Sequence, residues 1–251
     1  VTIGARTVLA GPDRAPVLPA SPAPSAPLPS TPVPSVPPPS TPAPARSTAA
    51  GPVGTPSSPA TRPIPDAIPD RAFLQKADWK GAIVEGPERT SYDVPRLCGT
   101  LPPDQELIGV SGTSLLTFRA PGVPADYTPT GTVYDTVTVY RRSGATDFLR
   151  DLRDAVRTCA VDTIGGREYR YRSRGSVGAG DESLVIEEST AGYDDAGEPT
   201  GDTRYAYIAA VRVGDTVALI QLDGWESASA ERADAVTFAR AAARRVADWR
   251  G

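Results

Sequence analysis

The chain has 251 residues, a formal net charge of −4 and no histidine. The acidic balance argues against a nucleic-acid surface, which is normally basic. The absence of histidine removes the Ser-His-Asp and Cys-His catalytic arrangements and the usual catalytic zinc sites. Composition therefore disfavours most catalytic classes before any motif is considered.

Residues 1–67 have the composition of a segment that cannot fold. Of the 28 prolines in the chain, 20 lie between Pro12 and Pro69, interleaved with Ser, Thr and Ala. Proline removes backbone donors, and the segment offers almost no large apolar side chain to offset the entropy of ordering. We predict a disordered, polyproline-II-like stalk over residues 1–67 and a single domain over residues 68–251.

Nothing in the sequence approaches the ~20 consecutive apolar residues of a membrane-spanning helix. The chain begins with Val1 and contains no methionine. A stalk ahead of a single domain is typical of a displayed protein. We therefore expect an extracytoplasmic protein that is secreted or attached to the cell membrane, with an anchor upstream of Val1. A featureless N-terminal leader is equally compatible with these residues.

The two cysteines, Cys98 and Cys159, both lie inside the predicted domain. A disulfide between them would close a loop of about 60 residues and contribute roughly 4 kcal/mol by chain entropy. A pair of buried free thiols in a cytosolic protein is the alternative. The stalk favours the disulfide and an oxidising compartment.

Helices are predicted at the start, middle and end of the domain. Asp70 can cap a short helix over 70–79 that buries Phe73, Leu74 and Ala77. The apolar stripe from Phe148 to Cys159 predicts an amphipathic helix over 146–159. A third helix is expected to begin at a Ser227 or Ser229 cap and to run to about Trp249, with Val236, Ala239, Ala243 and Val246 on its packed side.

Alternation of apolar and polar residues predicts the strands, at 114–119, 132–141, 168–174, 183–188, 204–213 and 216–222. Gly214-Asp215 is a two-residue hairpin signal, and Asp223-Gly224 suggests a turn. In 168–174 we expect the tyrosines to point inward and the arginines outward. Together the elements predict an α+β fold with a mainly antiparallel sheet and flanking helices.

Three segments invite a chemical interpretation. Ser111 lies in a sequence that resembles a nucleophile elbow, but the spacing is wrong, so we expect a turn before the 114–119 strand. The acidic stretch 193–202 lacks the alternating Asp pattern of a calcium loop, and a solvated hairpin is favoured. Gly178-Ala-Gly180 lacks the lysine of a phosphate loop and is interpreted as a turn. We expect no metal ion, no cofactor and no nucleic-acid partner.

A sharper interpretation places ligand-binding groups after that turn. Asp181, Glu182 and Ser183 would then lie at the mouth of a cleft, with Trp225 as a further candidate binding residue. Acidic groups there would favour cationic or hydroxyl-rich ligands. Carboxylates acting as a pair on a glycan are the one acid–base chemistry left, but nothing in the sequence singles out a pair.

The order of these elements resembles the actinobacterial PknH-like extracellular sensor domain over about 70–251. The residues that carry the resemblance are the helix Phe148-Leu-Arg-Asp-Leu-Arg-Asp-Ala-Val-Arg-Thr-Cys159, Gly180-Asp-Glu-Ser183 and the 211–219 hairpin. The resemblance implies an α+β domain with a cleft for an unidentified ligand and no catalysis. The kinase ectodomain of that family looks to have two disulfides, whereas this chain has cysteines for one.

Two functional classes remain open. The first is a non-catalytic sensor or ligand-binding domain, displayed on the stalk from the bacterial cell membrane. The second is a structural or adaptor protein of the cell envelope. In both cases the partner is an envelope-derived ligand or protein.

Overall fold

The computed structural model describes residues 62–92, 97–99, 105–194, 196–226 and 228–251. The predicted stalk, apart from residues 62–67, lies outside the described residues, and its boundary with the domain stays a prediction. Neither described helix combines the length and hydropathy that a membrane span requires.

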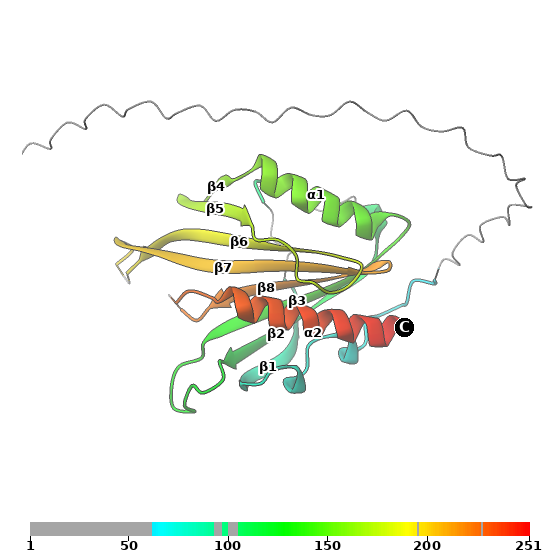
Figure 1. Cartoon of the computed structure of the whole chain (residues 1–251), viewed down its shortest axis with the longest axis horizontal. Helices are drawn as coiled ribbons and strands as arrows, with labels where there is room; N and C mark the ends of the chain where they lie inside the picture. Colours follow the sequence, from blue (N-terminus) through cyan, green and yellow to red (C-terminus); the bar gives the residue numbers. More distant parts are fainter. Residues whose placement is uncertain (1–61, 93–96, 100–104, 195, 227) are drawn as a thin grey trace, which may run out of the picture. The chain divides into compact units, whose positions relative to one another are not determined.

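Eight strands form one antiparallel sheet in the order β1-β2-β3-β8-β7-β6-β5-β4 (Figure 1). The strands are β1 (Ala82–Thr90), β2 (Ile108–Arg119), β3 (Gly131–Tyr140), β4 (Val161–Ile164), β5 (Arg167–Ser173), β6 (Glu182–Tyr193), β7 (Pro199–Val213) and β8 (Thr216–Gly224). The helices are α1 (Gly144–Thr158) and α2 (Arg232–Arg250), and short 3₁₀ turns lie at Asp70–Ala72, Lys76–Asp78 and Gln105–Leu107. The predicted α+β class, with its mainly antiparallel sheet and flanking helices, is confirmed.

The two helices pack on opposite faces of the sheet. Along β7 the side chains alternate, so that Ala209 belongs to the core cluster that contains α2, while Ile208 and Ala210 belong to the cluster that contains α1. The centre of β7 is buried on both faces because each face carries a helix, which explains its run of apolar residues. The α2 cluster also takes in Phe73 and Trp79 from the segment before β1.

The disulfide between Cys98 and Cys159 is present, with 6.1 Å between the two Cα atoms. Cys159 caps the C-terminal end of α1, one residue after Thr158, and it is largely buried. The bond therefore ties the C-terminal end of α1 to the segment that precedes β2.

Several predicted elements differ from the observed ones. The expected helix over 70–79 is two separate 3₁₀ turns, because the backbone is extended between them, where the amide of Leu74 donates to the buried carboxylate of Asp135 at 2.7 Å. Ala77, which was expected on the buried side, is exposed. Ser111 lies within β2 rather than in a turn, and Asp223-Gly224 continues β8.

Other differences concern the ends of elements. The acidic stretch 193–202 is a hairpin, as predicted, but its loop is shorter than the whole stretch because β6 runs to Tyr193 and β7 starts at Pro199. The edge strands β1 and β4 were not predicted. α2 begins after Glu231 without a side-chain cap, since the Ser229 hydroxyl accepts the amide of Tyr205 instead. Ser227 lies outside the described residues.

Candidate functional site: a pocket where two strands part

α1 covers only part of its face of the sheet. Its cluster takes side chains from the half of β6, β7 and β8 that lies near the β7–β8 hairpin, among them Leu184, Ala210 and Leu219. Further along the same face the strands carry polar side chains, which include Tyr134, Glu188, Arg204, Gln221 and Asp223. The face thus has an apolar half beneath α1 and a polar half beyond it.

Strand register places two carboxyl groups on either side of a small residue in the polar half. Ala206 of β7 pairs with Glu188 of β6. On its other side the β7–β8 ladder ends at Tyr207 and Leu222, one residue before Ala206 and Asp223 would pair. Glu188 and Asp223 therefore flank Ala206 from strands that lie about 10 Å apart, or two strand spacings.

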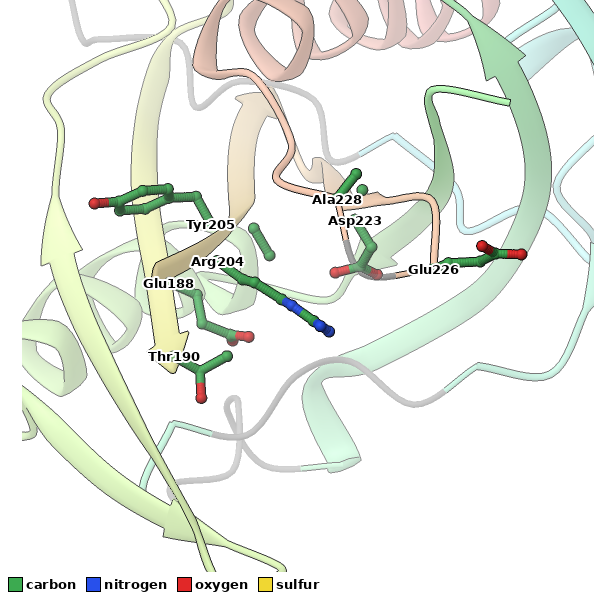
Figure 2. A pocket seen from close by; sticks show the side chains of 9 residues that line it. Glu188, Thr190, Arg204, Tyr205, Asp223, Glu226 and Ala228 are labelled. Carbon is green, nitrogen blue, oxygen red and sulfur yellow. The ribbon is translucent and has the colours of Figure 1, made fainter. Parts of the chain in front are cut away.

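Where β7 and β8 part, a pocket of about 140 Å³ opens (Figure 2). We call it the Ala206 pocket, and its lining includes Glu188, Thr190, Arg204, Ala206, Asp223 and Gly224. None of these six residues is fully buried, so the pocket is open to solvent. In Figure 2 the side chains of Glu188, Arg204 and Asp223 face the pocket, whereas Tyr205 points away from it.

Both carboxyl groups are harder to ionise than usual. Burial is the main reason that the pKa of Glu188 is raised to about 7, and the negative charge of Asp223 adds to the effect. Burial also raises the pKa of Asp223, although a hydrogen bond from the Gln221 side-chain amide, at 3.2 Å, partly opposes this. The pocket thus holds two carboxyl groups whose charges are poorly solvated.

Tyrosines stand around the carboxyl pair. Tyr92 stacks on Tyr134 with 4.0 Å between ring centroids, and its hydroxyl donates to the side-chain oxygen of Gln221. Tyr171 pairs with Glu188 across β5 and β6. Burial raises the pKa of Tyr92, and the charges of Asp223 and Glu188 raise it further, which places the phenol within electrostatic reach of both carboxyl groups.

The residues predicted from sequence do not gather at this pocket. Asp181 accepts hydrogen bonds from the amide of Gly214 at 2.7 Å and from Arg212 at 3.2 Å. Glu182 forms ion pairs with Arg153 and Arg212. Partial burial opposes the ionisation of Glu182, but these two arginines keep its pKa below the usual value. Both acidic side chains are therefore engaged within the fold, at the β7–β8 hairpin.

The other two predicted residues lie apart. Ser183 is almost fully buried, and its hydroxyl bonds to that of Ser176 at 2.7 Å and accepts the amide of Val177 at 3.1 Å. Trp225 follows β8 at its far end, where its amide donates to the carbonyl of Thr130. The nine residues of β8, about 30 Å of extended chain, separate Trp225 from the hairpin beside Asp181 and Glu182. The binding role of the four residues stays a prediction.

The residues of the Ala206 pocket were missed for identifiable reasons. Glu188 had been assigned to the end of a strand, and Asp223 to a turn. A polar residue that shares a strand face with buried apolar residues is a usable signal, because it marks where a covering layer ends. That signal is present at Glu188, two residues after buried Ile186, and at Asp223, four residues after buried Leu219.

A metal centre would need several acidic or cysteine side chains to lie close together. Within the described ranges, no group of three or more Cys, Asp or Glu side chains is arranged to hold a metal ion. The expectation that the protein uses no metal stays a prediction.

Comparison with known proteins gives limited similarity. No protein-family model matches the chain, and no curated protein matches it. The crystal structure of the extracellular domain of PknH from Mycobacterium tuberculosis is similar to this chain with a TM-score of 0.36 and 14% sequence identity. The match covers 55% of this chain and 63% of that domain, which is less than two thirds of its length. Similarity at this level does not establish family membership.

Proposed function

We propose that this chain is a non-catalytic sensor or ligand-binding domain of the bacterial cell envelope, carried on the stalk of residues 1–67, and that its ligand occupies the Ala206 pocket. One observation carries the proposal: the sheet face that α1 covers only in part opens, beyond the helix, into a pocket flanked by Glu188 and Asp223. Pockets that combine an apolar floor with a few convergent polar groups are the usual form of small-ligand sites.

The shape of the pocket supports binding by a small group rather than by a flat protein surface. The methyl group of Ala206 forms its floor, and a larger side chain there would fill the space between the flanking carboxyl groups. Thr190 and Arg204 add a hydroxyl and a guanidinium at one end. These groups suit hydroxyl-bearing and amine-bearing ligands, of the kind that cell-wall glycopeptides supply.

The proposal is tested with soluble peptidoglycan fragments, added to the full chain and followed by amide chemical shifts in NMR. Shifts are expected at Glu188, Ala206 and Asp223, and the variant Ala206→Leu should bind at least ten-fold more weakly. Ala125→Leu, on an exposed loop, is the matched control and should bind like the parent. Binding that survives Ala206→Leu, or release of a cleaved product from the fragments, would overturn the proposal.

The same titration tests the prediction made from sequence. If Asp181 and Glu182 lie at the mouth of the ligand site, the double variant Asp181→Ala with Glu182→Ala should lose binding while Ala206→Leu retains it. The Ala206 pocket requires the opposite pattern.

An envelope adaptor is the alternative, and the edge strand β4 favours it. β4 ends the sheet on one side, and its Val161 and Ile164 side chains are 45% and 48% exposed. Exposed apolar edge strands are prone to pair with another chain. If adaptor function dominates, Val161→Lys should abolish recovery of the protein with the envelope fraction and leave peptidoglycan-fragment binding unchanged.

A further inference from the structure

The two carboxyl groups of the Ala206 pocket lack the arginine partner that Glu187 and Asp78 have. Arg174 binds Glu187 through two hydrogen bonds, and Arg245 binds Asp78 in the same way. By contrast, no arginine or lysine among the described residues forms an ion pair with Glu188 or Asp223. Arginines therefore neutralise Glu187 and Asp78, whereas the Glu188–Asp223 pair has no such partner.

Arg204 lines the pocket without neutralising it. Its guanidinium donates to the backbone carbonyl of Tyr193, and its charge is not among the influences that set the pKa of Glu188. The groups that face Glu188 are Asp223 from β8, Tyr171 from β5 and Tyr92 from the segment after β1. The charged form of Glu188 is thus opposed by burial and by Asp223 together.

A stacked tyrosine pair helps to position the Asp223 carboxyl group from outside the pocket. Tyr92 and Tyr134 are stacked at an interplanar angle of 18°, and the Tyr92 hydroxyl is linked through Gln221 to Asp223. The two rings lie outside the pocket lining, and the hydrogen bond from Tyr92 fixes the Gln221 side chain that donates to Asp223.

Resting on the proposed function, we propose that the ligand carries an organic ammonium group, which lies over Ala206 between Glu188 and Asp223. An ammonium donates up to three hydrogen bonds, so one group can bind both carboxylates. A divalent metal fits less well, because calcium takes six to eight oxygen ligands and the pocket converges two carboxyl groups.

Binding of a cation should displace a proton from the pair. With the pKa of Glu188 raised to about 7, the free pocket is partly protonated at neutral pH, and an ammonium favours the charged form. Affinity is therefore expected to fall as pH decreases through 7. The decrease should approach ten-fold per pH unit once the pair is mostly protonated.

The test uses a matched pair of probes on the full chain: N-acetyl-lysine methylamide and its analogue with a hydroxyl in place of the ammonium. At pH 8 the lysine derivative is expected to bind at least ten-fold more tightly, with amide shifts at Glu188 and Ala206. Glu188→Gln and Asp223→Asn should each remove most of this preference. Asp154→Asn, an equal loss of charge on the exposed side of α1, should leave it unchanged.

A pH series separates charge recognition from a merely structural role. The affinity of the parent for the lysine derivative should fall about ten-fold from pH 8 to pH 6, while that of Glu188→Gln stays nearly constant. Thermal unfolding of each variant confirms that it is folded. Since both substitutions remove a poorly solvated charge and conserve shape, they should not lower stability at pH 8.

The outcomes distinguish the two proposals. If the hydroxyl analogue binds as tightly as the lysine derivative, the ammonium inference is overturned while the pocket keeps its role as a ligand site. If neither probe nor the peptidoglycan fragments shift the amides around Ala206, the proposed function fails as well. If the lysine derivative binds but Glu188→Gln does not change its affinity at either pH, the ammonium group lies elsewhere and the inference is wrong.

Discussion

The two faces of the sheet carry one helix each, yet they are built differently. On the α2 face an alanine-rich helix lies close to the sheet, and apolar side chains run from β2 across to β6, with Phe118, Phe238 and Ile220 fully buried. On the α1 face the apolar cluster stops partway along the strands, and polar side chains follow. The comparison indicates that the α2 face supplies most of the stability, while neither helix covers the polar half of the α1 face.

A substitution in the core between α2 and the sheet should lower the free energy of unfolding most. Phe238 stacks on Trp79 with 4.4 Å between ring centroids and lies edge-on to Phe118 at 5.0 Å. Phe238→Ala is expected to cost about 3–5 kcal/mol because a cavity would remain. Tyr134→Ala, on the polar half of the α1 face, should cost clearly less. Urea unfolding of both variants tests this, and equal costs would contradict the comparison.

Removal of the disulfide, which lies on the α1 side of the sheet, should cause the next largest loss of stability. Replacing Cys98 and Cys159 together by serine is expected to lower the free energy of unfolding by about 2–4 kcal/mol, since the closed loop in the unfolded state would be lost. Denaturant unfolding of parent and variant measures the difference, and addition of reductant to the parent serves as the control. No change with either treatment would show that packing of α1 alone holds this face.

Within the α2 face, Asp135 is the one acidic group buried against the apolar side chains of β3. Its Oδ2 accepts the Leu74 amide, its Oδ1 has no partner among the described residues, and burial raises its pKa to about 7. Because the folded-state pKa lies above the unfolded value, stability should fall as pH rises from about 4 to 7 and remain low above 7. Asp135→Asn should therefore stabilise the protein at pH 8 by about 1–2 kcal/mol and have little effect at pH 4.

Thermal unfolding at pH 4 and pH 8 tests the Asp135 prediction. The nearby charges are Asp78, which opposes ionisation, and Arg89, which favours it. Asp215→Asn, at an ion pair with Arg250, is the contrasting substitution and should destabilise the protein at pH 8. A stabilising effect of Asp135→Asn that is the same at both pH values would rule out an effect of ionisation.

The smallest change in stability is expected from a substitution in the Ala206 pocket. Glu188→Gln removes a poorly solvated charge, but the side chain is partly exposed, so solvent screens most of the cost. We expect a gain below about 1 kcal/mol at pH 8, which disappears below about pH 4, where the carboxyl is protonated in both folded and unfolded states. A loss of stability at pH 8 would show that the Glu188 carboxylate has an internal partner, and that the pocket is structural.

The hydrophobic pattern predicted the central elements because their periods are local properties. Alternation predicted β3 at 132–141, and the apolar stripe from Phe148 to Cys159 predicted α1. The edge strands were harder, since β1 and β4 are only partly buried and lack regular alternation. The 70–79 segment follows a helical pattern, but its backbone bonds to Asp135, 61 residues away, and this contact overrides the local preference.

The residues of the candidate site could not be predicted from a local pattern. Asp181 and Glu182 attracted attention because they are adjacent acids after a glycine-rich turn, yet tertiary contacts pair them with Arg212 and Arg153. Glu188 and Asp223 are 35 residues apart in sequence, and only the strand order β8-β7-β6 brings them to either side of Ala206. No local pattern encodes that juxtaposition.

By itself the sequence determined what depends on neighbouring residues: the proline-rich composition of residues 1–67, the α+β class, the amphipathic helix that ends at Cys159, and the lack of histidine chemistry. The tertiary structure decided how far α1 reaches across the sheet, where β7 and β8 part, and which acids remain without a cation. These features depend on contacts between residues far apart in the chain, because burial and charge pairing are set by the assembled sheet rather than by any one strand.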